Sequence, residues 1–168
     1  MPDAPRLVLV LGDQLDAASS AFDGFDATRD IVWMAEVKHE STKVWSAKPR
    51  TAVFLAAMRH FRECLLEREW RVDYREVGGP GGETFAAQLR DAVERWHPER
   101  LIMLEAGEWS TAQEIEGLAD KLSLPLEVRT DRHFLCTREM FQRHAANRKQ
   151  LRMEFFYREM RQYTGTLM

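Results

Sequence analysis

The sequence predicts a doubly wound, Rossmann-like α/β fold, in which a five-stranded parallel sheet carries helices on both faces and a helical connector follows. Five short runs rich in Val, Ile and Leu recur at residues 7–11, 31–37, 71–77, 100–104 and 126–129. Segments of helical period separate the later runs, and this alternation is typical of parallel strands joined by crossover helices. The 168 residues are 45% hydrophobic, which is enough to bury one ordinary core.

Three crossover helices are predicted from apolar side chains at helical spacing. The first has its apolar side at Val53, Phe54, Ala57, Met58, Phe61, Cys64 and Leu65, with Pro49 near its start. The second carries Phe85, Leu89, Ala92, Val93 and Trp96, and the third carries Ile115, Leu118, Ala119 and Leu122 before Pro125. The glycine-rich segment 78–82 predicts a loop, and 19–29 predicts a loop with at most one helical turn.

The end of the chain differs from the rest in charge. Residues 129–168 hold nine Lys or Arg and four Asp or Glu, whereas residues 1–128 hold 15 and 23. We therefore divide the chain into an α/β domain, 1–136, and a basic helical connector, 137–168. Exposed aromatic side chains beside a basic face indicate that this connector packs on something else or self-associates.

Composition and cysteine content exclude several classes of protein. The longest apolar runs fall short of the roughly 20 residues that a membrane-spanning helix needs, and no secretion signal opens the sequence, so we expect a cytoplasmic protein without membrane contact. The two cysteines, Cys64 and Cys136, lack the paired spacings that are typical of a disulfide framework or a metal cluster. We expect both to be buried thiols.

Polar residues follow three of the predicted strands. Gly12, Asp13 and Gln14 follow the first strand, and Glu105, Gly107, Glu108 and Trp109 follow the fourth. Glu36 ends the second strand, with His39, Glu40 and Ser41 just beyond it. Ligands of open parallel sheets bind outside the carboxyl ends of the strands, where the strand order reverses. If the first and fourth strands flank that point, their polar residues converge on one crevice.

The crevice lacks the sequence patterns of a nucleotide-phosphate site. Neither G-x-G-x-x-G nor G-x-x-x-x-G-K-S/T occurs, and Asp13 stands where a phosphate requires bare N–H groups. Acceptors near Trp109 and Phe54 favour a neutral, flat heterocycle that carries N–H and O–H donors. Asp13 has an alternative interpretation as a residue that stabilises its own turn.

Two further functions remain open at this point. The chain could be a stand-alone Rossmann-like hydrolase or nucleotide-binding protein that uses Glu105, Glu108 and His39. Alternatively, the connector could bind nucleic acid through its basic residues, which are Arg143, Arg148, Lys149, Arg152, Arg158 and Arg161.

Six motifs in order resemble one known family. They are L-V-L-V-L-G-D-Q-L at 7–15, E-V-K-H-E-S at 36–41, A-A-M-R-H-F-R at 56–62, E-A-G-E-W at 105–109, D-R-H-F-L at 131–135 and R-K-Q-L-R-M-E-F-F-Y-R-E-M-R at 148–161. Together they resemble the amino-terminal part of the prokaryotic iron–sulfur photolyases and cryptochromes, the deoxyribodipyrimidine photolyase-related proteins. The resemblance extends from about residue 6 to the last residue.

The resemblance implies an antenna domain of a flavoprotein for light-dependent DNA repair or blue-light sensing. By that similarity the antenna chromophore is 6,7-dimethyl-8-ribityllumazine, and no residue of this chain is catalytic. The implied chromophore contacts are Gly12, Asp13, Gln14, Ala35, Glu36, Val37, Glu40 and Phe54. FAD, a 4Fe-4S cluster and the DNA groove are implied to lie in a carboxyl-terminal helical domain that this chain lacks, so that domain is the expected partner and DNA is bound only by the full-length protein.

Overall fold

The computed structural model describes residues 4–37, 47–79 and 84–166. The chain divides into two compact units, Met1–Arg129 and Thr130–Met168, and the sequence-based boundary after residue 136 falls within the second. The elements of the first unit are β1 (Arg6–Leu9), the 3₁₀ turn η1 (Ser20–Phe22), β2 (Ile31–Ala35), α2 (Lys48–Leu66), β3 (Val72–Arg75), α3 (Phe85–Trp96), β4 (Arg100–Leu104), α4 (Trp109–Lys121) and β5 (Leu126–Arg129). The second unit contains α5 (Arg138–Ala145) and α6 (Met153–Thr164).

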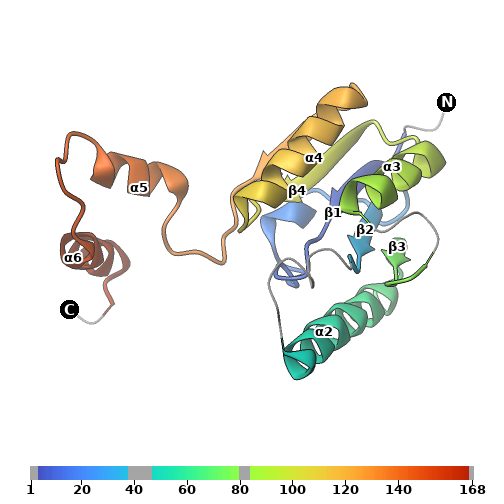
Figure 1. The fold of residues 1–168 in the computed structure, drawn as a ribbon, viewed down its shortest axis with the longest axis horizontal. Helices are drawn as coiled ribbons and strands as arrows, with labels where there is room; N and C mark the ends of the chain where they lie inside the picture. Colours follow the sequence, from blue (N-terminus) through green and yellow to red (C-terminus); the bar gives the residue numbers. More distant parts are fainter. Residues whose placement is uncertain (1–3, 38–46, 80–83, 167–168) are drawn as a thin grey trace. The chain divides into compact units, whose positions relative to one another are not determined.

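The five strands form one parallel sheet in the order β3-β2-β1-β4-β5. The α3 and α4 helices cover one face of this sheet and α2 covers the other face, as Figure 1 shows. The predicted doubly wound α/β fold is confirmed. The 3₁₀ turn η1 is the single helical turn expected in the first crossover.

Alternation along the strands sends buried side chains to both faces. On β1 and just beyond it, Leu7, Leu9 and Leu11 join the core under α3 and α4, whereas Val8 and Val10 join the core under α2. Neither face of β1 meets water, which explains why its sequence reads as a continuous apolar run.

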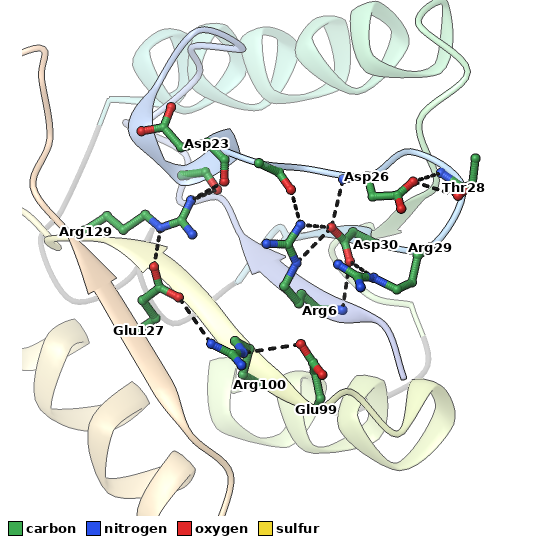
Figure 2. A network of polar contacts seen from close by, with 12 residues as sticks. Arg6, Asp23, Asp26, Thr28, Arg29, Asp30, Glu99, Arg100, Glu127 and Arg129 are labelled. Carbon is green, nitrogen blue, oxygen red and sulfur yellow. Dashed lines mark hydrogen bonds and ion pairs between the residues drawn. The ribbon is translucent and has the colours of Figure 1, made fainter. Parts of the chain in front are cut away.

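A buried carboxylate fixes the start of β2 and the crossover before it. Asp30 is fully buried and accepts hydrogen bonds from Nε of Arg6, from Nε of Arg29 and from the backbone N–H of Asp26. Figure 2 shows these side chains gathered around Asp30. Burial raises the pKa of Asp30, but the hydrogen bonds outweigh it and hold the pKa well below its ordinary value.

A second group of polar contacts joins η1 to the far edge of the sheet. Nη1 of Arg129, the last residue of β5, donates to the carbonyls of Ser20, Ala21 and Asp23 at 2.8, 3.1 and 3.0 Å. Figure 2 shows the Arg129 side chain between Asp23 and Glu127. The Nε atom of Arg129 donates to Oε1 of Glu127 at 2.7 Å. Arg129 thereby gives the carbonyls of Ala21 and Asp23 a donor, and it shares the Ser20 carbonyl with the backbone N–H of Asp23.

Two expectations about burial are wrong. Val53, predicted on the buried side of the first crossover helix, is 71% exposed, and the fully packed residues of α2 are Met58, Phe61 and Leu65. The helical period identifies a face but not how much of the helix lies over the sheet. The two free cysteines are half-buried instead of buried, because Cys64 lies on the flank of α2 and Cys136 precedes α5.

The second unit is a pair of helices joined by one buried contact. His144 of α5 is buried, and its Nδ1 lies 2.6 Å from Oε2 of Glu159 on α6. The His144 and Phe141 rings both pack edge-on against Phe156. No described residue of α6 is itself fully buried, so most of its surface is exposed.

Candidate functional site

The strand order reverses between β1 and β4. The chain passes from β1 outward through β2 to β3, and then returns to the other side of β1 to form β4. The loops that leave the carboxyl ends of β1 and β4 therefore diverge around one crevice, which is where open α/β sheets bind ligands. The predicted position of the switch point is confirmed by the observed strand order.

Gln14 joins the two loops of the crevice. Its Nε2 donates to the backbone carbonyl of Glu105 at 3.0 Å, and its side chain is only 7% exposed. The other amide atom, Oε1, is buried and has no hydrogen-bond partner among the described residues. A buried acceptor without a donor costs free energy, so this oxygen is a natural place for a ligand N–H or O–H group.

Asp13 extends from the first loop toward the second. It is exposed, and a Cβ placed on Gly107 would lie 3.2 Å from its Oδ2. The absence of a side chain at Gly107 therefore leaves room for the Asp13 carboxylate. Together, Asp13 and Gln14 bring two acceptors to the crevice.

Phe54 forms an aromatic wall beside the first loop. A Cβ placed on Gly12 would lie 2.3 Å from Cζ of Phe54, 2.5 Å from its Cε1 and 2.9 Å from Sδ of Met58. Only glycine permits this approach, and the Phe54 ring remains 40% exposed. The α2 helix thus contributes a flat apolar surface beside Gly12, in the loop that also carries Asp13 and Gln14.

Glu36 is only 2% exposed, and its carboxylate has four protein donors. Oε1 accepts from Nε of Arg59 at 2.6 Å and from the Tyr74 hydroxyl at 2.7 Å. Oε2 accepts from Nη2 of Arg59 at 2.9 Å and from the backbone N–H of Val77 at 3.0 Å. Sequence reasoning missed Arg59 and Tyr74, and no local signal marks either as a partner of Glu36.

Of the other implied chromophore contacts, two are buried in the core and one lies outside the described residues. Ala35 and Val37 are both buried, with their side chains in the core under α3 and α4. Glu40, His39 and Ser41 lie outside the described residues. The structure therefore brings Gly12, Asp13, Gln14 and Phe54 together, and places Glu36 in a separate polar cluster between β2, β3 and α2.

The two acids after β4 lie at the end of the strand and at the start of the next helix. The backbone N–H of Glu105 donates to the Arg129 carbonyl at 2.9 Å, and Glu108 is the N-cap residue of α4. Trp109, the first residue of α4, is 75% exposed. Within residues 4–37, 47–79 and 84–166, no three His, Cys, Asp or Glu side chains form a group that could hold a metal ion.

Several basic side chains of the second unit already have partners. Arg158 pairs with Glu154 at 2.6 Å, and Arg148 lies 3.8 Å from Glu159.

Among the helices that the structure describes, none is long and apolar enough to cross a membrane.

Comparison with known proteins identifies the family. The sequence profile of the deoxyribodipyrimidine photo-lyase-related proteins matches residues 8–168. This chain belongs to that family. A (6-4) photolyase of Agrobacterium fabrum is 38% identical over 164 residues, which cover 97% of this chain but 32% of the relative. The chain thus spans about a third of the length of this photolyase-related protein, and the suspected family membership is confirmed.

Proposed function

We propose that this chain is the antenna-chromophore-binding domain of a photolyase-like flavoprotein and that the crevice between β1 and β4 binds 6,7-dimethyl-8-ribityllumazine. The buried, unpartnered Oε1 of Gln14 is the observation that carries this proposal, since it offers an acceptor at the switch point of the sheet. The chromophore would fulfil there the hydrogen-bonding capacity that the protein leaves open.

The described residues fit the chemistry of a lumazine. Its flat ring system carries an N–H donor, and its ribityl chain carries several O–H donors. Asp13 and Gln14 would accept from these groups, and Phe54 would pack against the ring. Gly12 would let the Phe54 ring lie close to the backbone beside the chromophore, and the backbone of residues 35–37 would complete the wall. Glu40, outside the described residues, remains a proposed contact.

A bound lumazine supplies absorption of light and transfer of the excitation energy to a flavin. The residues of this chain would bind the ring, orient it and exclude water from one of its faces. FAD, a 4Fe-4S cluster and DNA binding are proposed to belong to the remainder of a full-length protein. The 32% coverage of the (6-4) photolyase supports this division. The exposed aromatic side chains of α6, Phe155, Tyr157 and Tyr163, are proposed to pack on that remainder.

The test is a fluorescence and absorbance titration of the folded protein with 6,7-dimethyl-8-ribityllumazine. We expect saturable binding by the wild type. Gln14→Met keeps the side-chain length but removes both amide atoms, and Asp13→Ala removes an exposed carboxylate. Each should weaken binding about fivefold or more, because a hydrogen bond to a charged or buried group contributes about 1–3 kcal/mol.

The matched control is Gln113→Met, which changes an exposed glutamine on α4. It should bind like the wild type, and circular dichroism should show that all three variants remain folded. A folded wild type that shows no change in lumazine fluorescence at any concentration would refute the proposed function.

A further inference from the structure

The Glu36 carboxylate has no acceptor capacity left for a ligand. Each of its oxygens accepts two hydrogen bonds from Arg59, Tyr74 or the Val77 backbone, and an ionised carboxylate has about four acceptor sites. Burial raises the pKa of Glu36, but the hydrogen bonds from Arg59, Val77 and Tyr74 outweigh it and hold the pKa at about 2. The group is therefore ionised at neutral pH and cannot donate to a carbonyl of a bound heterocycle.

The donors to Glu36 are themselves held in place. The Arg62 guanidinium lies over the Tyr74 ring, 4.9 Å from its centroid, and Arg62 also pairs with Glu76 at 3.2 Å. Burial and the Glu36 carboxylate raise the pKa of Tyr74, so its hydroxyl remains a donor. The cluster joins β2, β3, the residues after β3, and α2 around one buried charge.

The same helix carries the aromatic wall of the proposed site. Phe54 and Met58, which face the Gly12 backbone, lie one turn apart on α2, and Arg59 follows Met58 directly. The first half of α2 is largely exposed, as the 71% exposure of Val53 illustrates. Along the described part of α2, the bidentate pair of Arg59 with Glu36 is the first side-chain polar contact between the helix and the β2 end of the sheet, where Glu36 directly follows the strand.

We propose that Glu36 is a positioning residue of the chromophore site: its carboxylate holds α2 through Arg59, so that the Phe54 ring lies on Gly12, and it does not itself touch the ligand. The ligand part of this inference rests on the proposed function. The geometric part concerns Glu36, Arg59, Phe54 and Gly12 alone, and it is tested without any ligand.

The ligand-free test measures the NMR chemical shift of the Gly12 α-protons. Because the Phe54 ring packs against Gly12, its ring current displaces these resonances, and Phe54→Leu defines the shift without the ring. We expect Arg59→Met to move the Gly12 resonances at least halfway toward the Phe54→Leu values. Arg50→Met, a matched change of an exposed arginine in the first turn of α2, should leave them unchanged.

A folded Arg59→Met protein whose Gly12 resonances equal those of the wild type would overturn the inference. Should Arg59→Met not fold, Arg59→Lys decides the question, because lysine retains the charge but cannot make the bidentate contact. We then expect a smaller displacement in the same direction, and wild-type Gly12 shifts in Arg59→Lys would contradict the inference.

The ligand test is a double-mutant cycle on lumazine affinity. If Arg59 acts through Phe54, the Phe54→Leu/Arg59→Met double variant binds no more weakly than Phe54→Leu alone. If Glu36 touches the ligand directly, Glu36→Gln shifts the absorption maximum of bound lumazine and its effect adds to that of Phe54→Leu, which would overturn the inference. A wild type that binds no lumazine would refute the proposed function, while the Gly12 resonances would still decide the role of Glu36.

Discussion

Gly12 lies where Phe54 and Met58 leave no room for a side chain. An alanine Cβ would stand 2.3 Å from Cζ of Phe54 and 2.9 Å from Sδ of Met58, both well inside contact distance. The φ angle of Gly12 is not in the left-handed region, so the backbone itself accepts alanine. The Gly12→Ala change therefore destabilises the protein through steric overlap, which disrupts the packing of α2 against the loop after β1.

The free energy of unfolding that Gly12→Ala costs depends on which side chains must move. Phe54 is partly exposed and can rotate outward, whereas Met58 is buried and must shift within the core. Inserting one methyl group into packed surroundings typically costs 1–3 kcal/mol. For a chain of this size, each kcal/mol lowers the melting temperature by about 2–4 °C. We expect a decrease of about 2–12 °C.

Thermal unfolding followed by circular dichroism measures this effect, with Gly117→Ala as the control. Gly117 lies inside α4, and a Cβ placed there meets no heavy atom within 4 Å. Alanine at that position should raise stability by about 0.5–1 kcal/mol through helix propensity. Truncating the ring in Gly12→Ala/Phe54→Ala should relieve part of the Gly12→Ala cost. Equal melting temperatures for Gly12→Ala and the wild type would refute the contact between Phe54 and Gly12.

Three further changes test other parts of the structure. Asp30→Asn should destabilise the protein strongly at pH 7 and less at low pH, because the folded-state pKa of Asp30 is lowered and its contribution is lost as pH falls below about 3.8; a pH-independent effect in thermal melts would contradict this. Thr84→Ala removes the hydroxyl that caps α3 by accepting from the Ala87 N–H at 3.2 Å, and urea unfolding should show a loss of about 1 kcal/mol. Arg129→Met removes the guanidinium donor from the carbonyls of residues 20, 21 and 23, so amides of residues 22–25 should exchange hydrogen faster, while unchanged exchange would exclude the proposed role of Arg129.

The three central strands were predictable because buried parallel strands are continuous apolar runs, whereas the edge strands β3 and β5 each include charged residues. The expected runs 100–104 and 126–129 coincide with β4 and β5. The run 7–11 extends past β1, which ends at Leu9, although the Val10 N–H still donates to the Trp33 carbonyl at 3.0 Å. The run 71–77 exceeds β3 at both ends, and at its carboxyl end the Val77 N–H turns toward Glu36. Hydrophobicity identifies a strand, whereas its last residue depends on long-range partners.

The location of the candidate site was predictable from the chain order, but its internal contacts were not. Residues that follow parallel strands meet at one edge of the sheet, so the convergence of Asp13 and Gln14 with the loop after β4 could be expected. The partners of Glu36 could not, because Arg59 and Tyr74 lie 23 and 38 residues away in the sequence. A buried carboxylate must have partners, but only the packing of α2 and β3 on β2 determines which.

The most direct test of the proposed chromophore site is an NMR titration of the isotope-labelled protein with 6,7-dimethyl-8-ribityllumazine. The proposed site predicts saturable shifts of the Gly12, Gln14 and Gly107 amides and of the Gln14 side-chain amide. The Gly24 amide, near Arg6 at the opposite end of β1, should not shift. Saturable binding that shifts Gly24 but leaves Gly12, Gln14 and Gly107 unchanged would contradict the crevice between β1 and β4 as the chromophore site.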